Sequence, residues 1–291
     1  MTLGIVHNPY ATNVSTRLSE AAARLGLPVR VIDLPSLGVE VDVSGGTTVR
    51  DRAGPVHVSA VAPYLLFGFP AAVHALRVLT GRAYTQNPVD GVLIADDKAT
   101  TAIALASAGV PQVPTWIRPF QEEPALQAAD EIGYPVVLKR THGAQGRWVR
   151  RAADPAALRS AFRELEVEGP GAVLLQPEVT EFSGRSIRAV LTGGEMLAAT
   201  LRTASAEEWR SNVAGGADQR PVDLTPHERS LAVAAARALG LGHAGIDLLR
   251  TAQGTVVLEV NACPDFTSML PHTSVDMTRA VLSHSLPSIA G

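Results

Sequence analysis

The stretch GIDLLRTAQGTVVLEVNACPD, residues 245–265, decides the fold and carries the chemistry. Glu259 and Asn261 are two residues apart in an apolar segment, so on a strand their side chains point to the same face. A hairpin whose loop centres on Gln253 brings Asp247 opposite Glu259. We therefore expect the oxygen atoms of Asp247, Glu259 and Asn261 to converge on one face of a hairpin.

Such a set of oxygen ligands indicates a magnesium site. Carboxylate and amide oxygens suit Mg²⁺, a hard cation that shares its coordination shell with substrate phosphates. The alternative is a solvated hairpin with ordinary surface acids. Because apolar residues flank the acids on both sides, burying them without a cation would be costly, and we favour the metal. A shift of one residue in the strand register would abolish the arrangement.

A glycine-containing loop follows a second apolar strand, in which VVLK occupies residues 136–139. Gly143 and Gly146 permit close approach of the loop backbone, whose N–H groups could cover phosphate oxygens. Lys139 would be a costly buried cation without an anion, although a lysine that reaches water from the strand end is a common alternative. No GxxxxGK[ST] motif occurs, so the expected nucleotide site is not a P-loop.

Arginines are concentrated around the strands expected between these two motifs. Arg188 and Arg202 lie on segments that we interpret as adjacent antiparallel strands joined at Gly193 and Gly194, so pairing about that turn places them near each other. An anion between the two guanidinium groups would lower their repulsion. At least one of the four is expected to be an ordinary solvated side chain; they are Arg185, Arg188, Arg202 and Arg210.

Composition limits the class of protein. The chain has 291 residues, 46% of them hydrophobic, which is enough for two or three joined lobes. Its 25 basic and 28 acidic residues are interspersed, so there is no electrostatic signal for nucleic acid or an anionic membrane as partner. The chain has one cysteine, Cys263, and no recognisable leader or membrane-spanning segment. We expect a cytoplasmic protein that acts on small molecules or a small protein.

Apolar periodicity predicts an α/β fold. GLGHAG, residues 240–245, follows a predicted helix and precedes a strand, so it is interpreted as a helix end rather than a dinucleotide motif. Residues 43–55 are a weakly patterned, Gly-rich stretch, and residues 203–221 are expected to form an Arg- and Gly-rich loop. The expected helices span 16–25, 71–80, 98–108, 124–132 and 226–239, and the expected strands 3–8, 27–34, 134–140, 172–179, 186–192 and 195–202, followed by the hairpin over 245–261.

Several motifs occur in the order found in a known family. The chain resembles the ATP-grasp ligases of the RimK and LysX type in DDKATTAIALASAGVPQVPTW, GYPVVLKRTHGAQG, LLQPEV, GRSIRAVL, WRSNVAGG and AGIDLL…VVLEVNACPD. The resemblance implies an ATP-grasp fold, with α+β lobes. It divides the chain into an N-terminal α/β pre-ATP-grasp domain (1–95), a central lobe with the phosphate-covering glycine loop (96–175) and a C-terminal lobe with the magnesium and substrate site (176–291).

The resemblance also implies roles for individual residues. Lys98 and Lys139 would contact the nucleotide phosphates or adenine, the loop 143–146 would close over the phosphates, and Glu181 would bind the ribose. Adenine would lie along the backbone of residues 176–179. The implied nucleotide-binding residues are Lys98, Lys139, Gly143, Ala144, Gln145, Gly146, Gln176, Pro177, Glu178, Val179 and Glu181. The implied magnesium ligands are Asp247, Glu259 and Asn261. The residues implied to stabilise the γ-phosphate and the acyl phosphate are Arg188, Arg202, Arg210 and Asn212.

The implied reaction is the ATP-dependent joining of a carboxylate to an amine through an acyl phosphate, with release of ADP and phosphate. Two Mg²⁺ ions are expected, and Mn²⁺ is expected to substitute. The expected carboxylate is the α- or γ-carboxyl of free glutamate and the amine that of an amino acid. A LysX-like alternative activates the C-terminal glutamate of a small acidic carrier protein, and alternatives of another class are an ATP-grasp kinase and a non-catalytic nucleotide-binding module. A homodimer or homotetramer is a family-level expectation.

The chain departs from the family pattern at two positions. It has QPE at residues 176–178, where members often have QEF or QEY, and Ser186 where GxDIR has an aspartate. No general base for the amine is evident. His142, His272 and Cys263 have no paired acid or second histidine at a suggestive spacing, so we expect them to have structural roles.

Overall fold

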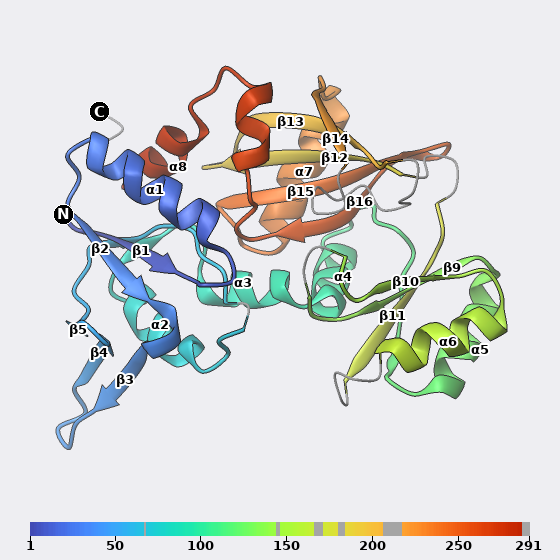
Figure 1. Cartoon of the computed structure of the whole chain (residues 1–291), viewed down its shortest axis with the longest axis horizontal. Coiled ribbons are helices and arrows are strands. Elements are labelled where there is room, and N and C mark those ends of the chain that lie inside the picture. Colours follow the sequence, from blue (N-terminus) through green and yellow to red (C-terminus); the bar gives the residue numbers. More distant parts are fainter. Residues whose placement is uncertain (67, 144–145, 166–170, 180–183, 206–216, 287–291) are drawn as a thin grey trace.

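The computed structural model describes residues 1–66, 68–143, 146–165, 171–179, 184–205 and 217–286. In Figure 1 the N-terminal lobe (blue) lies at the left, the central lobe (green) at the lower right, and a five-stranded sheet (yellow to red) above and between them. Helices and strands alternate along much of the chain, as the apolar periodicity predicts. Within the described ranges no helix is both long and apolar enough to cross a lipid bilayer.

The N-terminal lobe is built on a parallel sheet. Its strands are β1 (Leu3–His7), β2 (Val29–Asp33), β6 (Ala60–Val61) and β7 (Tyr84–Thr85), in the order β2-β1-β6-β7. Helix α1 (Thr12–Arg24) connects β1 to β2, and α2 (Ala72–Thr80) connects β6 to β7. Helix α1 begins four residues earlier than predicted, because Val14 extends the buried face formed by Leu18 and Ala21.

The central lobe has its own antiparallel sheet and its own core. The sheet has the order β10-β9-β11-β8, from β8 (Trp116–Pro119), β9 (Val136–Arg140), β10 (Val149–Ala152) and β11 (Ala172–Pro177). Helices α5 (Glu122–Ile132) and α6 (Pro155–Leu165) bury side chains such as Leu158 and Leu165 against it. Strand β9 is the predicted VVLK strand.

The C-terminal sheet is antiparallel throughout, in the order β14-β13-β12-β15-β16. Helix α7 (Pro226–Ala238) packs on β15 and β16, and a 3₁₀ helix, η5 (Thr267–His272), and α8 (Met277–Ser285) follow the last strand. The strands are β12 (Arg185–Thr192), β13 (Glu195–Thr203), β14 (Asp218–Pro221), β15 (His243–Thr251) and β16 (Gly254–Asn261).

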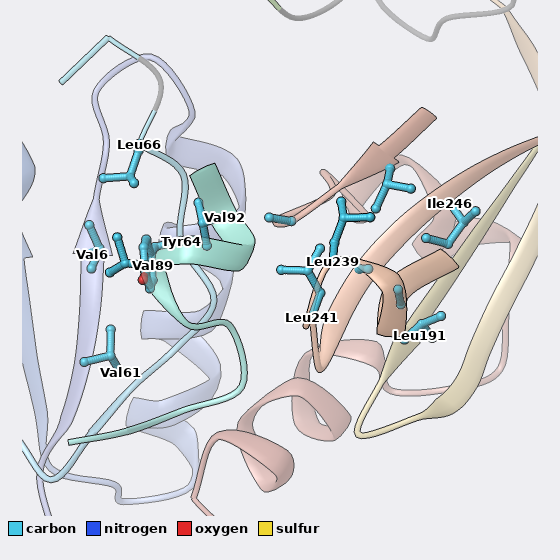
Figure 2. Close-up of a cluster of buried hydrophobic side chains, with 14 of the residues drawn as sticks. Val6, Val61, Tyr64, Leu66, Val89, Val92, Leu191, Leu239, Leu241 and Ile246 are labelled. Carbon is cyan, nitrogen blue, oxygen red and sulfur yellow. The ribbon is translucent and has the colours of Figure 1, made fainter. Parts of the chain in front are cut away.

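Two cores join the N-terminal lobe to the C-terminal sheet. One contains Val6, Val61 and Tyr64 together with Leu239 and Ile246, as Figure 2 shows in part. The other combines residues of β1 and α1 with Phe266, Met269 and residues of α8. These two lobes therefore share their interior, whereas the central lobe has a core of its own.

A polar joint fixes the connection between them. Asn87 is fully buried, and its Nδ2 donates to the carbonyls of His243 (2.8 Å) and Ala262 (2.5 Å), while its Oδ1 accepts from the His243 N–H (2.9 Å). Gln86 accepts from Thr192 Oγ1 (2.7 Å) and donates to Ser285 Oγ (3.2 Å). Because these groups are buried and mutually satisfied, they hold the two lobes in one orientation.

Some regular structure was not predicted. Residues 38–55 form a small antiparallel sheet of β3 (Gly38–Val41), β4 (Thr47–Asp51) and β5 (Gly54–Pro55), after a short 3₁₀ helix, η1 (Leu34–Ser36). The sequence predicted no element in residues 43–55, and the end of the predicted loop 203–221 was wrong, because it forms β14. Strand β14 is short and polar, so backbone pairing with β13 rather than an apolar pattern makes it a strand. In the first segment Val39 and Val49 pack on the core, but their strands are only four and five residues long.

Two consecutive helices lead into the central lobe. Helix α3 (Val89–Asp96) was not predicted, because its apolar residues show no helical periodicity. It packs closely against the end of α7, since a Cβ on Gly91 would lie 2.6 Å from the Leu239 carbonyl oxygen. Helix α4 (Lys98–Ser107) was predicted and begins where Asp97 caps the Thr100 N–H (2.8 Å).

Candidate active site

The predicted oxygen ligands share one face of the β15–β16 hairpin because of a β-bulge. The turn comprises Ala252 and Gln253, since Thr251 pairs with Gly254, and a regular hairpin from this turn would set Asp247 opposite Leu258. The register shifts between Asp247 and Leu248, so that Asp247 pairs with Glu259 instead. The predicted pairing of Asp247 with Glu259 is confirmed. The predicted loop centre, Gln253, was wrong by half a residue, because the turn is centred between Ala252 and Gln253.

The third predicted ligand lies one step along the same face. Asn261 pairs with Gly245, and its Nδ2 lies 3.5 Å from the Gly245 carbonyl oxygen. In the described part of the chain no three His, Cys, Asp or Glu side chains could by themselves hold a metal ion. A metal bound here would therefore use the two carboxylates and the Asn261 amide oxygen. This all-oxygen set fits Mg²⁺, with the remaining positions filled by water and phosphate.

Two lysines approach these acids from the side of the central lobe. Lys98, the first residue of α4, has its Nζ 3.5 Å from Glu259 Oε1 and 2.6 Å from the Gly143 carbonyl oxygen. Its backbone N–H donates to the Thr141 carbonyl (2.8 Å). The start of α4 thus ties the beginning of the glycine loop to the strand that carries Glu259 and Asn261.

Lys139 lies on β9, in the same group of charges. Burial lowers the pKa of its ammonium to about 8; the nearby Lys98 also lowers it, whereas Glu259 and Asp247 oppose the shift. The structure therefore brings Lys98, Lys139 and Glu259 together from three different elements, as an anion-binding site between two lobes requires.

Arg188 and Arg202 lie near each other, as predicted, and the anion between them is Asp247. Arg188 directly faces Asp247 across β12 and β15 and binds both carboxylate oxygens, with Nη2 2.7 Å from Oδ2. Arg202 Nη1 lies 3.7 Å from Asp247 Oδ1. Burial disfavours the charge on Arg188, but the Asp247 carboxylate outweighs it and raises the pKa of the guanidinium.

Arg202 is less well neutralised. Burial and the neighbouring Arg188 lower the pKa of its guanidinium to about 10, against the opposing effect of Asp247. Its Nε is buried and has no hydrogen-bond partner among the described residues. A buried donor without an acceptor is costly, so the position is suited to an anionic ligand such as a phosphoryl oxygen.

The predicted adenine edge forms part of β11 and the residues after it. Gln176 Nε2 donates to Thr115 Oγ1 (2.9 Å), and the Glu178 carboxylate accepts from Arg151 Nε (2.6 Å). The Glu178 N–H donates to the Pro135 carbonyl (3.1 Å). Adenine recognition by Gln176, Pro177, Glu178 and Val179 stays a prediction.

Five other predicted site residues lie outside the described residues; they are Ala144, Gln145, Glu181, Arg210 and Asn212.

Of the three residues for which we expect structural roles, the structure shows the surroundings of Cys263 and His142. Cys263 is buried, its Sγ lies 3.7 Å from the Pro63 carbonyl oxygen, and burial raises the pKa of its thiol to about 12, so it is not a nucleophile. His142 Nε2 lies 3.6 Å from Asp97 Oδ2, beside the glycine loop. Asp265, four residues after Asn261 in NACPD, was not singled out from the sequence, and its charge acts on Arg188 and Arg202.

Known proteins resemble this chain over most of its length. The profile of the RimK-like ATP-grasp domain matches residues 95–284. A probable alpha-L-glutamate ligase of Enterobacter sp. (strain 638) is 31% identical over 274 residues, covering 92% of this chain and 89% of the relative. The ribosomal protein bS6–L-glutamate ligase of Salmonella newport (strain SL254) is 32% identical over 268 residues, covering 90% and 87%.

The fold is also that of solved ATP-grasp structures. The RimK domain ATP-grasp protein from Sphaerobacter thermophilus DSM 20745 superposes with a TM-score of 0.73, at 22% identity, over 98% of this chain and all of that one. The predicted α/β ATP-grasp fold is thereby confirmed. With a family profile over most of the chain and relatives that are glutamate ligases, the chain belongs to the RimK-like ATP-grasp family of carboxylate–amine ligases.

Proposed function

We propose that this protein joins glutamate to the amine of an amino acid, with ATP as the energy source and ADP and phosphate as products. The observation that carries the proposal is the group of charges between β9, α4 and the β13–β12–β15–β16 face. Lys98 and Lys139 lie on one side of Glu259, and Arg188 and Arg202 lie around Asp247. Such an arrangement suits a metal-bound triphosphate whose terminal phosphoryl group lies towards the arginines.

The first step activates the carboxylate. One of its oxygens attacks the γ-phosphorus of ATP, the bond from that phosphorus to the β,γ-bridging oxygen breaks, and ADP leaves. Arg188 and Arg202 would stabilise the negative charge on the transferred group, and Lys98 and Lys139 that on the remaining phosphates. Asp247, Glu259 and Asn261 would hold Mg²⁺, which would supply electrostatic stabilisation of the phosphates. No side-chain nucleophile is needed.

The second step forms the amide. The amine nitrogen, having lost one proton from its ammonium form, attacks the acyl carbon of the acyl phosphate. The bond from that carbon to the phosphate oxygen breaks, phosphate leaves, and the nitrogen releases a second proton. Because water would hydrolyse the acyl phosphate, the chemistry requires a site closed to solvent. We assign this role to the glycine loop, whose described residues Thr141 and Gly143 contact Lys98.

The test is ADP release with ATP and Mg²⁺ over a matrix of carboxylates and amines, with mass detection of products. We expect release to require glutamate and a second amino acid together, and a product whose mass is their sum less one water. Phosphate transfer to glutamate or another acceptor in a stable product, without dependence on an amine, would identify a kinase instead. Nucleotide binding without turnover under every condition, a peptide carboxylate included, would indicate a non-catalytic binding module.

A second candidate places the activated carboxylate on a polypeptide. It is favoured by the relatives whose names describe ligation of L-glutamate to ribosomal protein bS6. The matrix therefore includes peptides that end in glutamate, offered with free glutamate as the amine. Turnover only with a peptide carboxylate would select this candidate, and turnover with free glutamate as the carboxylate would select the first. A small acidic carrier protein and a homodimer or homotetramer stay predictions.

A further inference from the structure

Arg202 is a buried guanidinium whose paired residues on both neighbouring strands are neutral. It lies on β13, between β14 and β12 in the five-stranded sheet (Figure 1). Ser186 on β12 and Gln219 on β14 pair with it directly. Directly paired residues of antiparallel strands place their side chains on the same face of the sheet. The two positions that face Arg202 across the strands therefore supply no negative charge.

The carboxylate closest to Arg202 is shared with a second arginine. Asp247 Oδ1 lies 3.7 Å from Arg202 Nη1, but both Asp247 oxygens already accept hydrogen bonds from Arg188. Glu259 and Asp265 act on Arg202 more weakly than Asp247 does. Among the described residues, two buried guanidinium groups thus share one close carboxylate. A buried charge without a partner is costly, so this arrangement favours the binding of a further anion.

One edge of the Arg202 guanidinium opens away from the metal ligands. The Nε and Nη2 atoms of a planar guanidinium form a fork of two donors, with which Arg188 binds Asp247. In Arg202 the nitrogen near Asp247 is Nη1, and the Nε–Nη2 edge opens on the opposite side of the planar group. Its Nε is buried and has no hydrogen-bond partner among the described residues. An anion bound by this edge would lie on the far side of the guanidinium from Asp247.

A substrate carboxylate suits this edge better than the γ-phosphate does. The γ-phosphate has to lie beside the predicted magnesium ligands on β15 and β16, which is the Nη1 side of Arg202. Both substrates of the proposed reaction carry a carboxylate that does not react. Glutamate has two carboxylates and uses one, and the amino acid that supplies the amine keeps its α-carboxylate. Either one is a planar anion that matches a guanidinium fork.

We infer that the Nε–Nη2 edge of Arg202 binds a substrate carboxylate that is not phosphorylated, and that the neutral Ser186 leaves this edge available. The inference rests on the proposed function and deepens it, because it adds a requirement for a second carboxylate in the substrates. The family pattern GxDIR has an aspartate at the position of Ser186. An aspartate there would face Arg202 and supply the counter-charge from the protein itself. In this chain the substrate supplies it.

Two substitutions of Ser186 separate the effect of charge from the effect of volume. Ser186→Asp places a carboxylate opposite Arg202, where it competes with the substrate. Ser186→Asn adds almost the same volume without the charge and is the matched control. Because Ser186 is buried, thermal unfolding shows whether each variant keeps its fold. Binding of Mg²⁺ and ADP, which has no γ-phosphate, shows whether the nucleotide site is intact, and we expect the two variants to agree within twofold.

The first measurement is binding, which does not depend on turnover. Saturation-transfer NMR with the enzyme, Mg²⁺ and ADP compares the twenty common amino acids and peptides that end in glutamate with analogues in which one carboxylate is an amide. We expect at least one ligand to bind and one of its amides to bind at least tenfold more weakly. Ser186→Asp should bind that ligand at least tenfold more weakly than Ser186→Asn does.

Three results of this measurement would overturn the inference. The first is that the wild type binds none of the amino acids or peptides. The second is that every amide binds within twofold of its parent ligand, since no second carboxylate is then recognised. The third is that Ser186→Asp and Ser186→Asn bind the ligand within twofold of each other. The comparison of amides uses the wild type alone, so it stands even if neither variant folds.

A second measurement identifies which substrate carries the carboxylate. Hydroxylamine traps an acyl phosphate as a hydroxamate, so this reaction needs only the substrate that is phosphorylated. If the KM for glutamate in hydroxamate formation is at least tenfold higher in Ser186→Asp than in Ser186→Asn, the carboxylate belongs to glutamate. If this KM is unchanged but the KM for the amino acid in amide formation is at least tenfold higher, the carboxylate belongs to the amine substrate. If neither KM changes, the inference is wrong.

The same reaction distinguishes failure of this inference from failure of the proposed function. If the wild type forms no hydroxamate from free or peptide glutamate, the proposed ligase reaction is wrong, and the NMR result alone decides whether Arg202 binds a carboxylate. If the wild type forms hydroxamate equally well from glutamate and from both of its monoamides, the ligase reaction stands and the requirement for a second carboxylate is wrong.

Discussion

Arg188 on β12 binds both carboxylate oxygens of Asp247 on β15, directly across the strand pair. Asp247 also lies 3.7 Å from Arg202 Nη1, and it is one of the three predicted magnesium ligands. All three side chains are buried, so the charge of each depends on the others. Asp247 therefore has two roles, one in holding the arginines and the other in the metal site, and these roles can be separated by experiment.

Asp247→Asn is expected to abolish turnover and also to weaken the fold. The amide cannot neutralise Arg188, and Arg202 loses the counter-charge that lies 3.7 Å from its Nη1. Among the described residues the two buried guanidinium groups then keep only the weaker influence of Glu259 and Asp265. Breaking a buried ion pair by removing one partner costs about 3–5 kcal/mol. Urea unfolding at pH 7.5 measures this loss, and ADP release measures turnover. If the unfolding free energy falls by less than about 1 kcal/mol, water or backbone groups solvate the arginine charges in place of Asp247.

Glu259→Ala provides the contrasting case. Glu259 is 37% exposed, and its ion pair with Lys98 spans 3.5 Å. Exposed pairs of this kind contribute about 0–1 kcal/mol, so we expect the urea midpoint to change little. Turnover should be lost because a predicted metal ligand is missing. ADP release at the wild-type rate would remove Glu259 from the metal site, whatever the stability of the variant.

The predictable part of this site lies within single hairpins. Asp247 and Glu259 could be paired from the sequence because a tight turn and alternating side chains relate them, although the bulge that completes the pairing has no sequence signal. The proximity of Arg188 to Arg202 followed in the same way from the turn between β12 and β13. Local geometry is sufficient for such predictions.

Contacts between distant segments could not be predicted. The pairing of Arg188 with Asp247 depends on β12 lying beside β15, and the contact of Asn13 with Asp265 spans 252 residues. Helix α3 and strand β14 were missed for a related reason, since packing between lobes and backbone pairing with β13 determine them rather than periodicity. Tertiary packing overrides local pattern at these positions.

Glu228 should stabilise the fold without affecting catalysis. It is buried at the start of α7, forms a capping box with Thr225, and accepts from Arg250 Nε (2.7 Å) and Nη2 (3.0 Å). The hydrogen bond from Arg250 lowers the pKa of its carboxyl to about 2, against an opposing effect of burial. This contribution to stability is present above the unfolded-state pKa of about 4.3 and is lost as the pH falls towards 2.

We expect Glu228→Gln to lower the unfolding free energy at pH 7 by about 1–2 kcal/mol, a value reduced because Arg250 is partly exposed. The variant should also lose less stability than the wild type between pH 5 and pH 3. Glu164→Gln, which alters an exposed pair with Arg150, is the control and should change stability by less than about 0.5 kcal/mol. If wild type and Glu228→Gln lose the same unfolding free energy between pH 5 and pH 3, another group causes the loss of stability in acid. His243 is one such group, because burial lowers its pKa to about 4.

Lys139 should make the affinity for ATP depend on pH. Burial lowers the pKa of its ammonium to about 8 in the nucleotide-free enzyme. Below this pH the lysine is charged and attracts phosphate; as the pH rises through 8 it becomes neutral, so the KM for ATP should increase from about pH 7.5 to 9.5. Lys139→Ala should raise the KM at pH 7 at least tenfold and remove this dependence.

Lys139→Arg is the sharper variant, because a guanidinium keeps its charge over the whole range. Its KM for ATP should stay constant between pH 7.5 and 9.5, even if the changed shape raises the value throughout. Titration of the ATP phosphates, complete below this range, affects wild type and variant alike and cannot produce a difference between them. If both proteins show the same rise in KM, the titrating group is not Lys139.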